Sequence, residues 1–404
     1  RPNRRCCRRS PSCVPHGSPA AATARDRYRV RVSITYLDHA ATTPMRPAAV
    51  EAMLPFFSER FANPSGSHRF ARDARRAIDE ARDQVAEVLG VAPGEVVFTG
   101  CGTEADNTAI LGAGGLALCA AAEHHAVLHP TQQHDGIVVG VDATGHIDLD
   151  QLEAALNTDV AIVSVMAVNN EVGTITDLAA VSRLVRRRSP QALLHTDAVQ
   201  AVCWLDLRQI APLVDLMSFS AHKFGGPKGV GVLTIRDGVS LDPLISGGGQ
   251  ERERRSGTHN VAGIAAMTSA LVETDRERID ENARLAGLRD RLVDGLRGEI
   301  DGVVETVPRD RKVAGSAHVC LEGIESESLL FLLDEAEVCA SAASACASGA
   351  MEPSHVLAAM CVDPSLAMGA LRLTLGHTTT ADDIDRATDV VASSVRRLRR
   401  SAGR

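Results

Sequence analysis

Lys223 lies where a lysine could form a covalent bond to a carbonyl group. An apolar run over residues 213–219 leads to Ser220-Ala-His-Lys223 and a glycine-rich turn, and a separate apolar run over 192–195 leads to Asp197. A lysine and a carboxylate at the ends of two buried strands meet the needs of pyridoxal phosphate, because the amine binds the aldehyde and the carboxylate keeps the pyridine nitrogen protonated. Taken alone, such a motif more often marks a surface lysine beside a turn.

A second group of residues could hold a phosphate. Residues 98–107 read as a strand, a glycine turn and the start of a helix. Free backbone N–H groups at a helix start, here at Gly102 and Thr103, bind anions, and the threonine adds a hydroxyl. Ser220 and His222 could donate to the same phosphate. By itself the glycine turn fits a plain helix cap at least as well.

Three further polar residues could contact the ring of such a cofactor. His124 follows a predicted strand, where its imidazole could stack on a pyridine, although a His-His pair in isolation is more often a satisfied polar edge. Asn170 and Gln200 could reach the phenolic oxygen. An uncharged donor at that oxygen would tune the bond to the lysine without competing with Asp197.

The elements that must position these residues alternate along the chain. Short apolar runs separated by helical patterns predict a mostly parallel sheet covered by helices on both faces, which is an α/β fold. The predicted strands are 95–99, 116–121, 137–141, 160–165, 192–195, 213–219 and 230–235, and the predicted helices are 46–60, 68–89, 103–112, 148–156, 177–188, about 275–298 and a closing helix after residue 380.

Two domains are expected in the body of the chain. The large domain covers residues 46–275, and a smaller α+β domain covers 276–404 and is completed by 32–45. Thr380 and Asp383 are spaced to form a capping box at the start of the closing helix.

The composition is that of an ordinary globular protein. Of 404 residues, 45% are hydrophobic and 23% charged, and the formal charge of −8 gives no reason to expect a nucleic-acid partner. No apolar run approaches the roughly 18 residues of a membrane span. Ten cysteines in a chain of this size, without the C-x-x-C spacing of zinc sites, indicate free thiols and a reducing cytoplasm.

Residues 1–31 differ from the rest. They contain nine arginines and one acidic residue, several prolines and no periodic apolar pattern. Their Arg-rich, acid-poor character resembles a transit peptide, but they form no obvious amphipathic helix and lack the apolar core of a secretory signal. We expect a disordered tail outside the fold.

Eight short segments of the body occur in an order that resembles the cysteine desulfurases of the NifS/IscS-like family, in class V of the fold-type I pyridoxal phosphate enzymes. The resemblance runs from about Tyr36 to about Thr380. It implies a large domain with a mostly parallel seven-stranded sheet and a smaller α+β domain. The matching segments are residues 36–43, 63–68, 102–107, 123–127, 169–173, 197–200, 220–223 and 255–258.

The resemblance implies a role for each candidate residue. Lys223 is expected to carry the cofactor and Asp197 to pair with the pyridinium. His124 is expected to stack on the ring and to move protons. Thr103, Ser220 and His222 are expected to hold the phosphate of the cofactor. Thr258 corresponds to a residue that a family member contributes to the phosphate of its partner subunit, which implies a homodimer with shared sites.

The resemblance also implies how a substrate is bound. Arg372 is the expected clamp for a substrate carboxylate, since a guanidinium matches a carboxylate in two-point geometry, and Asn170 is expected beside it. Cys346 lies in a run of small residues over 341–348, which leaves its thiol accessible. In the family this cysteine takes the substrate sulfur as a persulfide and could briefly ligate a nascent iron–sulfur cluster.

The expected function is therefore removal of sulfur from L-cysteine, giving L-alanine and a persulfide on Cys346. The expected acceptors are an iron–sulfur scaffold or a tRNA-thiolation protein. Two alternatives stay open: another class V reaction, such as that of a selenocysteine lyase or an aminotransferase, and a non-catalytic sulfur-carrying interaction protein. One departure from the family lies at Gly100-Cys-Gly-Thr103, where Cys101 is unusual so close to the cofactor.

Overall fold

The structure is a computed structural model that describes residues 34–342, 354–401 and 403. The predicted tail over 1–31 and the predicted persulfide residue Cys346 lie outside the described residues. Residues Thr35–Arg404 group into one compact unit.

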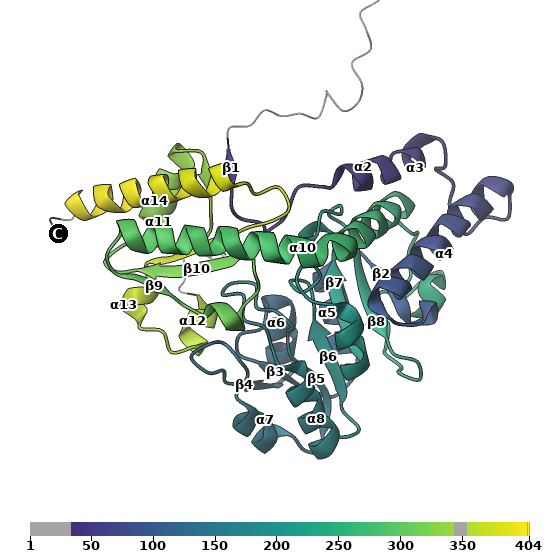
Figure 1. Ribbon diagram of the computed structural model, residues 1–404. Helices are drawn as coiled ribbons and strands as arrows, with labels where there is room; N and C mark the ends of the chain where they lie inside the picture. The colour runs from purple at the N-terminus through teal and green to yellow at the C-terminus, as the bar shows by residue number, and fades with distance from the viewer. Residues whose placement is uncertain (1–33, 343–353, 402, 404) are drawn as a thin grey trace, which may run out of the picture. The chain divides into compact units, whose positions relative to one another are not determined.

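A seven-stranded sheet forms the centre of this unit, as the sequence predicted (Figure 1). The spatial order is β2-β8-β7-β6-β5-β3-β4, and every strand runs parallel to the others except β8, which is antiparallel to both of its neighbours. The strands are β2 Val96–Thr99, β3 Leu116–Ala120, β4 Ile137–Val139, β5 Val160–Ser164, β6 Leu193–Asp197, β7 Leu216–Ser220 and β8 Gly231–Ile235.

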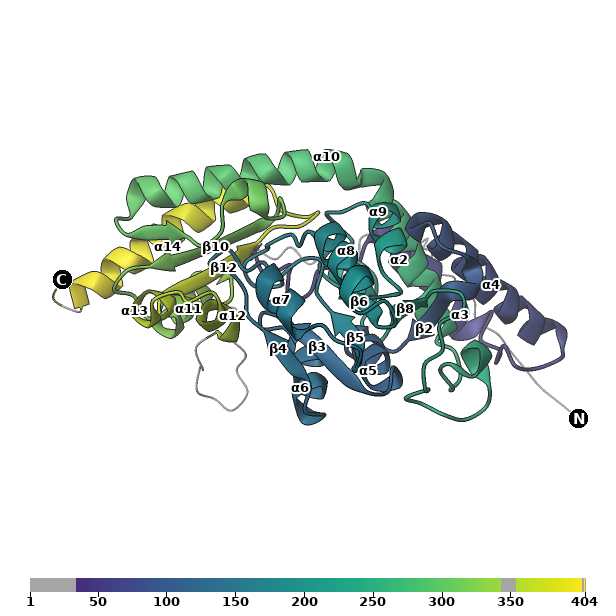
Figure 2. The ribbon, with the colours of Figure 1, turned by 90° about the horizontal axis from the view of Figure 1, so that it is seen from below.

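The strands are apolar at successive positions because both faces of the sheet are covered. Alternate residues of one strand belong to different core clusters: Leu216 packs with the helices of one face and Met217 with those of the other. Figure 2 shows α5 and α6 on one side of the sheet and α7 and α8 on the other. The covering helices are α4 Arg69–Leu89, α5 Gly102–Gly112, α6 His125–Gln133, α7 Leu149–Ala155, α8 Leu178–Arg188 and the short α9 Leu207–Ile210.

The helices differ from the prediction at several places, and α9 and the short helices between residues 321 and 370 were not predicted. The single helix expected over 46–60 is two, α2 Pro47–Met53 and α3 Pro55–Ser58, because Pro55 has no N–H to continue the first one. The helix expected at 275–298 is α10 Val261–Glu299, whose first half is apolar and packs on α2 and α4, so it lacks the charged pattern of its second half. Helix α6 was not predicted, since Pro130 lies inside it.

The C-terminal part has its own antiparallel sheet, in the order β12-β10-β9. In addition, β1 Thr35–Tyr36 pairs with β11 Val338–Cys339. The predicted boundary between residues 275 and 276 falls inside α10 and stays a prediction. The other elements of this part are β9 Val303–Glu305, β10 Ser316–Leu321, β12 Ala370–Thr374, α11 Ser326–Glu335, α12 His355–Ala359, α13 Pro364–Ala367 and α14 Ala381–Ser401.

Within the part of the chain that the structure describes, none of the helices combines the length and the apolar character needed to cross a bilayer.

The predicted capping box at the start of α14 is present, and it can be tested. The Asp383 carboxylate accepts the Thr380 N–H at 2.9 Å, and the Thr380 hydroxyl accepts the Asp383 N–H at 3.2 Å. We expect Thr380→Ala to lower the free energy of unfolding by about 1 kcal/mol in urea denaturation. Ser393→Ala, an exposed change on the same helix, should have almost no effect. Equal losses from both variants would contradict the capping role.

Candidate active site

A cavity of about 340 Å³ lies at the carboxyl edge of the seven-stranded sheet, within the usual size of a small-molecule site. The loops after β2, β3, β5, β6 and β7 all open onto it, which is where open α/β sheets bind ligands. Most of the residues predicted from sequence line this cavity: Gly102, Thr103, His124, Asn170, Asp197, Gln200, Ser220, His222, Lys223 and Arg372.

Lys223 is the lysine that lines the cavity. The chain has three lysines, of which Lys228 is exposed and Lys312 is buried in an ion pair with Glu305 at 2.8 Å. The Lys223 Nζ atom donates to the carbonyl oxygens of Ala40 at 2.5 Å and Ala41 at 2.9 Å. Burial, and then the nearby Arg372 guanidinium, lower the pKa of Lys223 to about 8. Near physiological pH this amine is therefore neutral and nucleophilic far more often than an ordinary lysine.

Asp197 ends β6 and faces the same cavity. Burial raises its pKa to about 6, while the Val199 N–H at 2.8 Å and the charge of Lys223 act in the opposite direction. A second carboxyl group, Asp106 of α5, also lines the cavity and was not predicted. Burial and the proximity of Asp197 hold the pKa of Asp106 well above its usual range. At neutral pH we therefore place the negative charge of this pair on Asp197.

His124 presents a neutral ring to the cavity. Its Nδ1 atom accepts the Ala126 N–H at 3.1 Å and so caps α6, which leaves the hydrogen of the neutral ring on Nε2. The side chain is solvent-exposed and lines the cavity. Burial and the neighbouring Lys223 charge lower the pKa of His124 to about 4. A neutral imidazole can stack on an aromatic ring and can accept or donate a proton there.

The start of α5 is built for close approach of an anion. Gly102 opens the helix, and a Cβ atom at this position would lie 2.8 Å from Val199 Cγ2, so only glycine leaves the turn open. Thr103 and Ser220 line the cavity here, and His222 lies beside them with its pKa lowered to about 4 by burial. Neutral donors around a helix start suit a phosphate.

Arg372 of β12 carries the positive charge on the far side of the cavity. Its guanidinium donates to the Asp38 carboxylate at 2.7 Å and to the Asn170 carbonyl at 3.0 Å. Within the described part of the chain, its Nε atom and the Oδ1 atom of Asn170 are buried without a hydrogen-bond partner. Buried polar atoms rarely stay unpaired, so a bound molecule with donors and acceptors fits this position. These orphaned atoms and the open turn at Gly102 fit pyridoxal phosphate with a substrate beside it.

Three predicted residues are not placed by the structure in their predicted roles. The Gln200 amide donates to the Ala40 carbonyl at 2.8 Å, so it shares that oxygen with Lys223 and its predicted contact with the cofactor stays a prediction. Thr258 is exposed and is not among the residues lining the cavity of its own chain. Cys346 lies outside the described residues.

The lowered pKa of Lys223 can be tested by covalent attachment of added pyridoxal phosphate to cofactor-free protein. Below the pKa, each pH unit reduces the neutral amine tenfold. We expect the attachment rate, followed by absorbance, to rise with pH and to level off above about 8, whereas an ordinary lysine of pKa 10.5 would continue to gain past pH 10. N-acetyl-lysine is the control. A protein rate that still rises tenfold between pH 9 and 10 would contradict the perturbed amine.

Comparison with known sequences gives the family. Residues 35–387 match the family described as aminotransferase class-V. The chain is 44% identical over 390 residues to an IscS-like cysteine desulfurase of Mycobacterium tuberculosis, covering 91% of this chain and 98% of that one. It is 41% identical over 376 residues to the cysteine desulfurase IscS of Dictyoglomus turgidum, covering 90% and 95%.

Solved structures agree with these sequence matches. A NifS-like protein superposes with a TM-score of 0.83 at 34% identity, covering 90% of this chain and 99% of the other. A structure titled "SspA in complex with cysteine" superposes with a TM-score of 0.75 at 30% identity, covering 85% and 99%. The chain therefore belongs to the class-V aminotransferase family and, within it, to the cysteine desulfurases.

Proposed function

We propose that this protein is a pyridoxal phosphate-dependent cysteine desulfurase, which moves the sulfur of L-cysteine to Cys346 and releases L-alanine. The observation that carries the proposal is the arrangement of Lys223, Asp197 and Arg372 around one cavity. An amine, a ring-nitrogen partner and a carboxylate clamp are the groups that the chemistry of an amino acid on this cofactor requires.

Each residue of the cavity has a separate role in the proposed reaction. When bound, pyridoxal phosphate supplies an electron sink for the substrate Cα. The start of α5 holds the phosphate, and Asp197 keeps the pyridine nitrogen protonated. Lys223, once free, accepts the proton of Cα, for which a pKa of about 8 is well matched to neutral pH. His124, with its hydrogen on Nε2, can return a proton to the substrate.

Arg372 orients the amino acid by its carboxylate. The guanidinium already spans from Asp38 to the Asn170 carbonyl, so its plane is fixed before substrate arrives. Its unpaired Nε and the unpaired Asn170 Oδ1 supply the remaining donor and acceptor. A prepositioned fork loses little side-chain entropy on binding.

The segment that contains Cys346 is anchored at both ends beside the cavity. Ser341 exchanges backbone hydrogen bonds with Arg372 at 2.7 and 3.1 Å, and the Ser354 hydroxyl bonds to Glu171, next to Asn170. Position 346 is five residues from Ser341, so the chain can span at most about 17 Å between them. This reach supports the proposal that the Cys346 thiol meets the substrate sulfur.

Sulfur transfer balances without an outside oxidant. The Cys346 thiolate forms an S–S bond to the substrate sulfur, the Cβ–S bond breaks, and its electron pair stays on carbon. Protonation of that carbon gives alanine, so the carbon is reduced while the two sulfurs are oxidised to a persulfide. The terminal sulfur then passes to an acceptor thiol, such as that of an iron–sulfur scaffold or a tRNA-thiolation protein, and Cys346 could ligate the cluster being built.

A homodimer is part of the proposal. Three phenylalanines on and beside α3 and α4 are largely exposed, Phe57 at 62%, Phe61 at 70% and Phe70 at 52%, which is typical of a surface covered by a partner. Thr258 is exposed and does not line the cavity of its own chain. This is expected of a residue that contributes to the site of a second subunit.

The role of Cys346 separates this function from its alternatives. We expect Cys346→Ser to lower alanine and persulfide formation from L-cysteine at least ~100-fold, because the nucleophile is lost, while the absorbance of the bound cofactor is unchanged. Cys361→Ser, at an exposed thiol, should keep almost full activity. Peptide mass after incubation with cysteine should show one added sulfur on the Cys346 peptide. Alanine formation that survives Cys346→Ser would favour an aminotransferase or a selenocysteine lyase, and a protein that binds no cofactor would favour a non-catalytic role.

The carboxylate clamp gives a separate prediction. Arg372→Lys keeps the charge but loses the two-point geometry, so we expect KM for L-cysteine to rise about tenfold with a smaller change in kcat. Arg291→Lys is the matched control, since Arg291 forms an exposed pair with Asp385 and does not line the cavity. An unchanged KM in Arg372→Lys would remove Arg372 from substrate binding.

A further inference from the structure

The loop before α10 is held in an unusual backbone conformation. Glu251, Arg252 and Glu253 have positive φ angles of 49°, 57° and 68°, a left-handed conformation that residues with side chains rarely adopt three times in succession. Such a conformation persists only where the surroundings fix it, and it is commonly found at functional sites.

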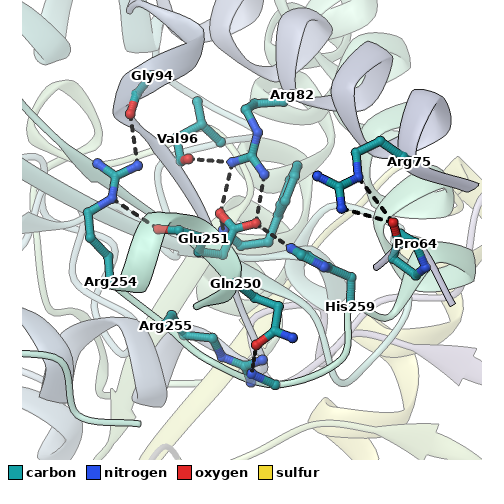
Figure 3. A network of polar contacts seen from close by, with 12 residues as sticks. Pro64, Arg75, Arg82, Gly94, Val96, Gln250, Glu251, Arg254, Arg255 and His259 are labelled. Atoms are coloured by element: carbon teal, nitrogen blue, oxygen red, sulfur yellow. Dashed lines mark hydrogen bonds and ion pairs between the residues drawn. The ribbon is translucent and has the colours of Figure 1, made fainter. Parts of the chain in front are cut away.

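A buried carboxylate fixes the loop. Glu251 accepts hydrogen bonds from the Arg82 guanidinium at 2.8 and 2.6 Å, from the Phe98 N–H at 3.0 Å and from His259 Nε2 at 2.6 Å (Figure 3). Arg82 also donates to the Val96 carbonyl at 2.5 Å. β2 is an edge strand, and among the residues that the structure describes no strand pairs with Val96 and Phe98 on this side. The Arg82 and Glu251 side chains satisfy their backbone groups instead.

The loop delivers Arg255 to the first turn of α5. Its guanidinium bonds to the Glu104 carboxylate at 2.7 and 3.2 Å, and both side chains are mostly buried, with 22% and 15% exposed. The same carboxylate accepts the Gly100 N–H at 2.8 Å. The Glu104 N–H in turn bonds to Cys101 Sγ at 3.4 Å, so one ion pair spans the turn that leads into the helix.

This turn contains an electrostatic conflict. The start of α5 is where the proposed function places a phosphate, yet Glu104 puts a carboxylate in the same helical turn, and two anions there repel. The conflict disappears if a cation neutralises Glu104. Neither Glu104 nor Arg255 lines the cavity, so neither contacts the cofactor directly.

We propose that Arg255 is a positioning residue for the phosphate site: it neutralises Glu104 and holds that carboxylate on the Gly100 N–H, so that the turn keeps its shape and its affinity for a dianion. The strained loop and its Arg82–Glu251–His259 contacts serve to place Arg255. This inference rests on the proposed use of pyridoxal phosphate and adds a residue outside the cavity to it.

The test compares pyridoxal phosphate with pyridoxal, which has the same ring and aldehyde but no phosphate. For cofactor-free full-length protein, we expect Arg255→Gln to weaken binding of pyridoxal phosphate about tenfold or more, since a net charge near the phosphate is lost, with pyridoxal binding almost unchanged. The double variant Glu104→Gln/Arg255→Gln removes the stranded carboxylate and should recover most of the affinity. Arg255→Lys should lose less than Arg255→Gln, and Arg291→Gln, at an exposed ion pair, should lose nothing.

Each other outcome has a definite meaning. A double variant as weak as Arg255→Gln, or an equal loss for pyridoxal and pyridoxal phosphate, would show general damage to the loop and overturn the inference. If Arg255→Gln bound pyridoxal phosphate as tightly as the wild-type protein, the inference would be overturned, while the proposed function would stand. If the wild-type protein bound pyridoxal phosphate no better than pyridoxal, the proposed cofactor and this inference would fall together.

Discussion

The site depends on an amine and a carboxylate that share one buried cavity. Asp197 ends β6 and Lys223 follows the adjacent parallel strand β7, with Asp197 paired in register with Ser218. Both groups lose hydration there, which pushes the pKa of the carboxyl up and that of the amine down, and each partly offsets the other. Neither charge would be tolerated alone at this depth. The parallel sheet is thus the device that brings two separate sequence segments to the ends of one ring-sized space.

The second constraint is the position of β12, which holds Arg372 at the cavity. Arg372 lies on β12, and β12 is aligned with the first extended residues through the bridge from Asp38 to Thr374. The Arg372 carbonyl and N–H also hold Ser341, at the start of the segment that contains Cys346. A small shift of β12 would therefore move the carboxylate clamp and the anchored end of the cysteine segment together. Under the proposed function, substrate binding and sulfur transfer would therefore be coupled through one strand.

Much of this could be predicted from the sequence, because its signals were local. Strand–helix alternation gave the parallel sheet, and Lys223, Asp197 and the glycine turn at Gly102 each follow a recognisable strand. Asp106 was missed since nothing in its helix distinguishes a residue facing a cavity from one facing solvent. The full length of α10 was missed because its first half is buried against α2 and α4 and has no polar face. These features are set by tertiary contacts.

The network around Glu251 was likewise beyond sequence reasoning. Arg82 and Glu251 are 169 positions apart, and only the folded edge strand shows that they replace a missing neighbour. Arg255, on the same loop as Glu251, pairs with Glu104, so the turn proposed to hold the phosphate is supported from outside the cavity. A buried ion pair of this kind fixes geometry more reliably than it adds stability.

The most direct test of the central claim is to find which lysine binds the cofactor. The protein would be loaded with pyridoxal phosphate, reduced with borohydride and digested, and the labelled peptide identified by mass. With only three lysines in the chain, the result is unambiguous. The account predicts one label per chain, on Lys223. In Asp197→Ala the amount of this label should fall only in proportion to the weaker binding of pyridoxal phosphate. A label on Lys228 or Lys312, or none, would contradict the assignment of this cavity as the active site.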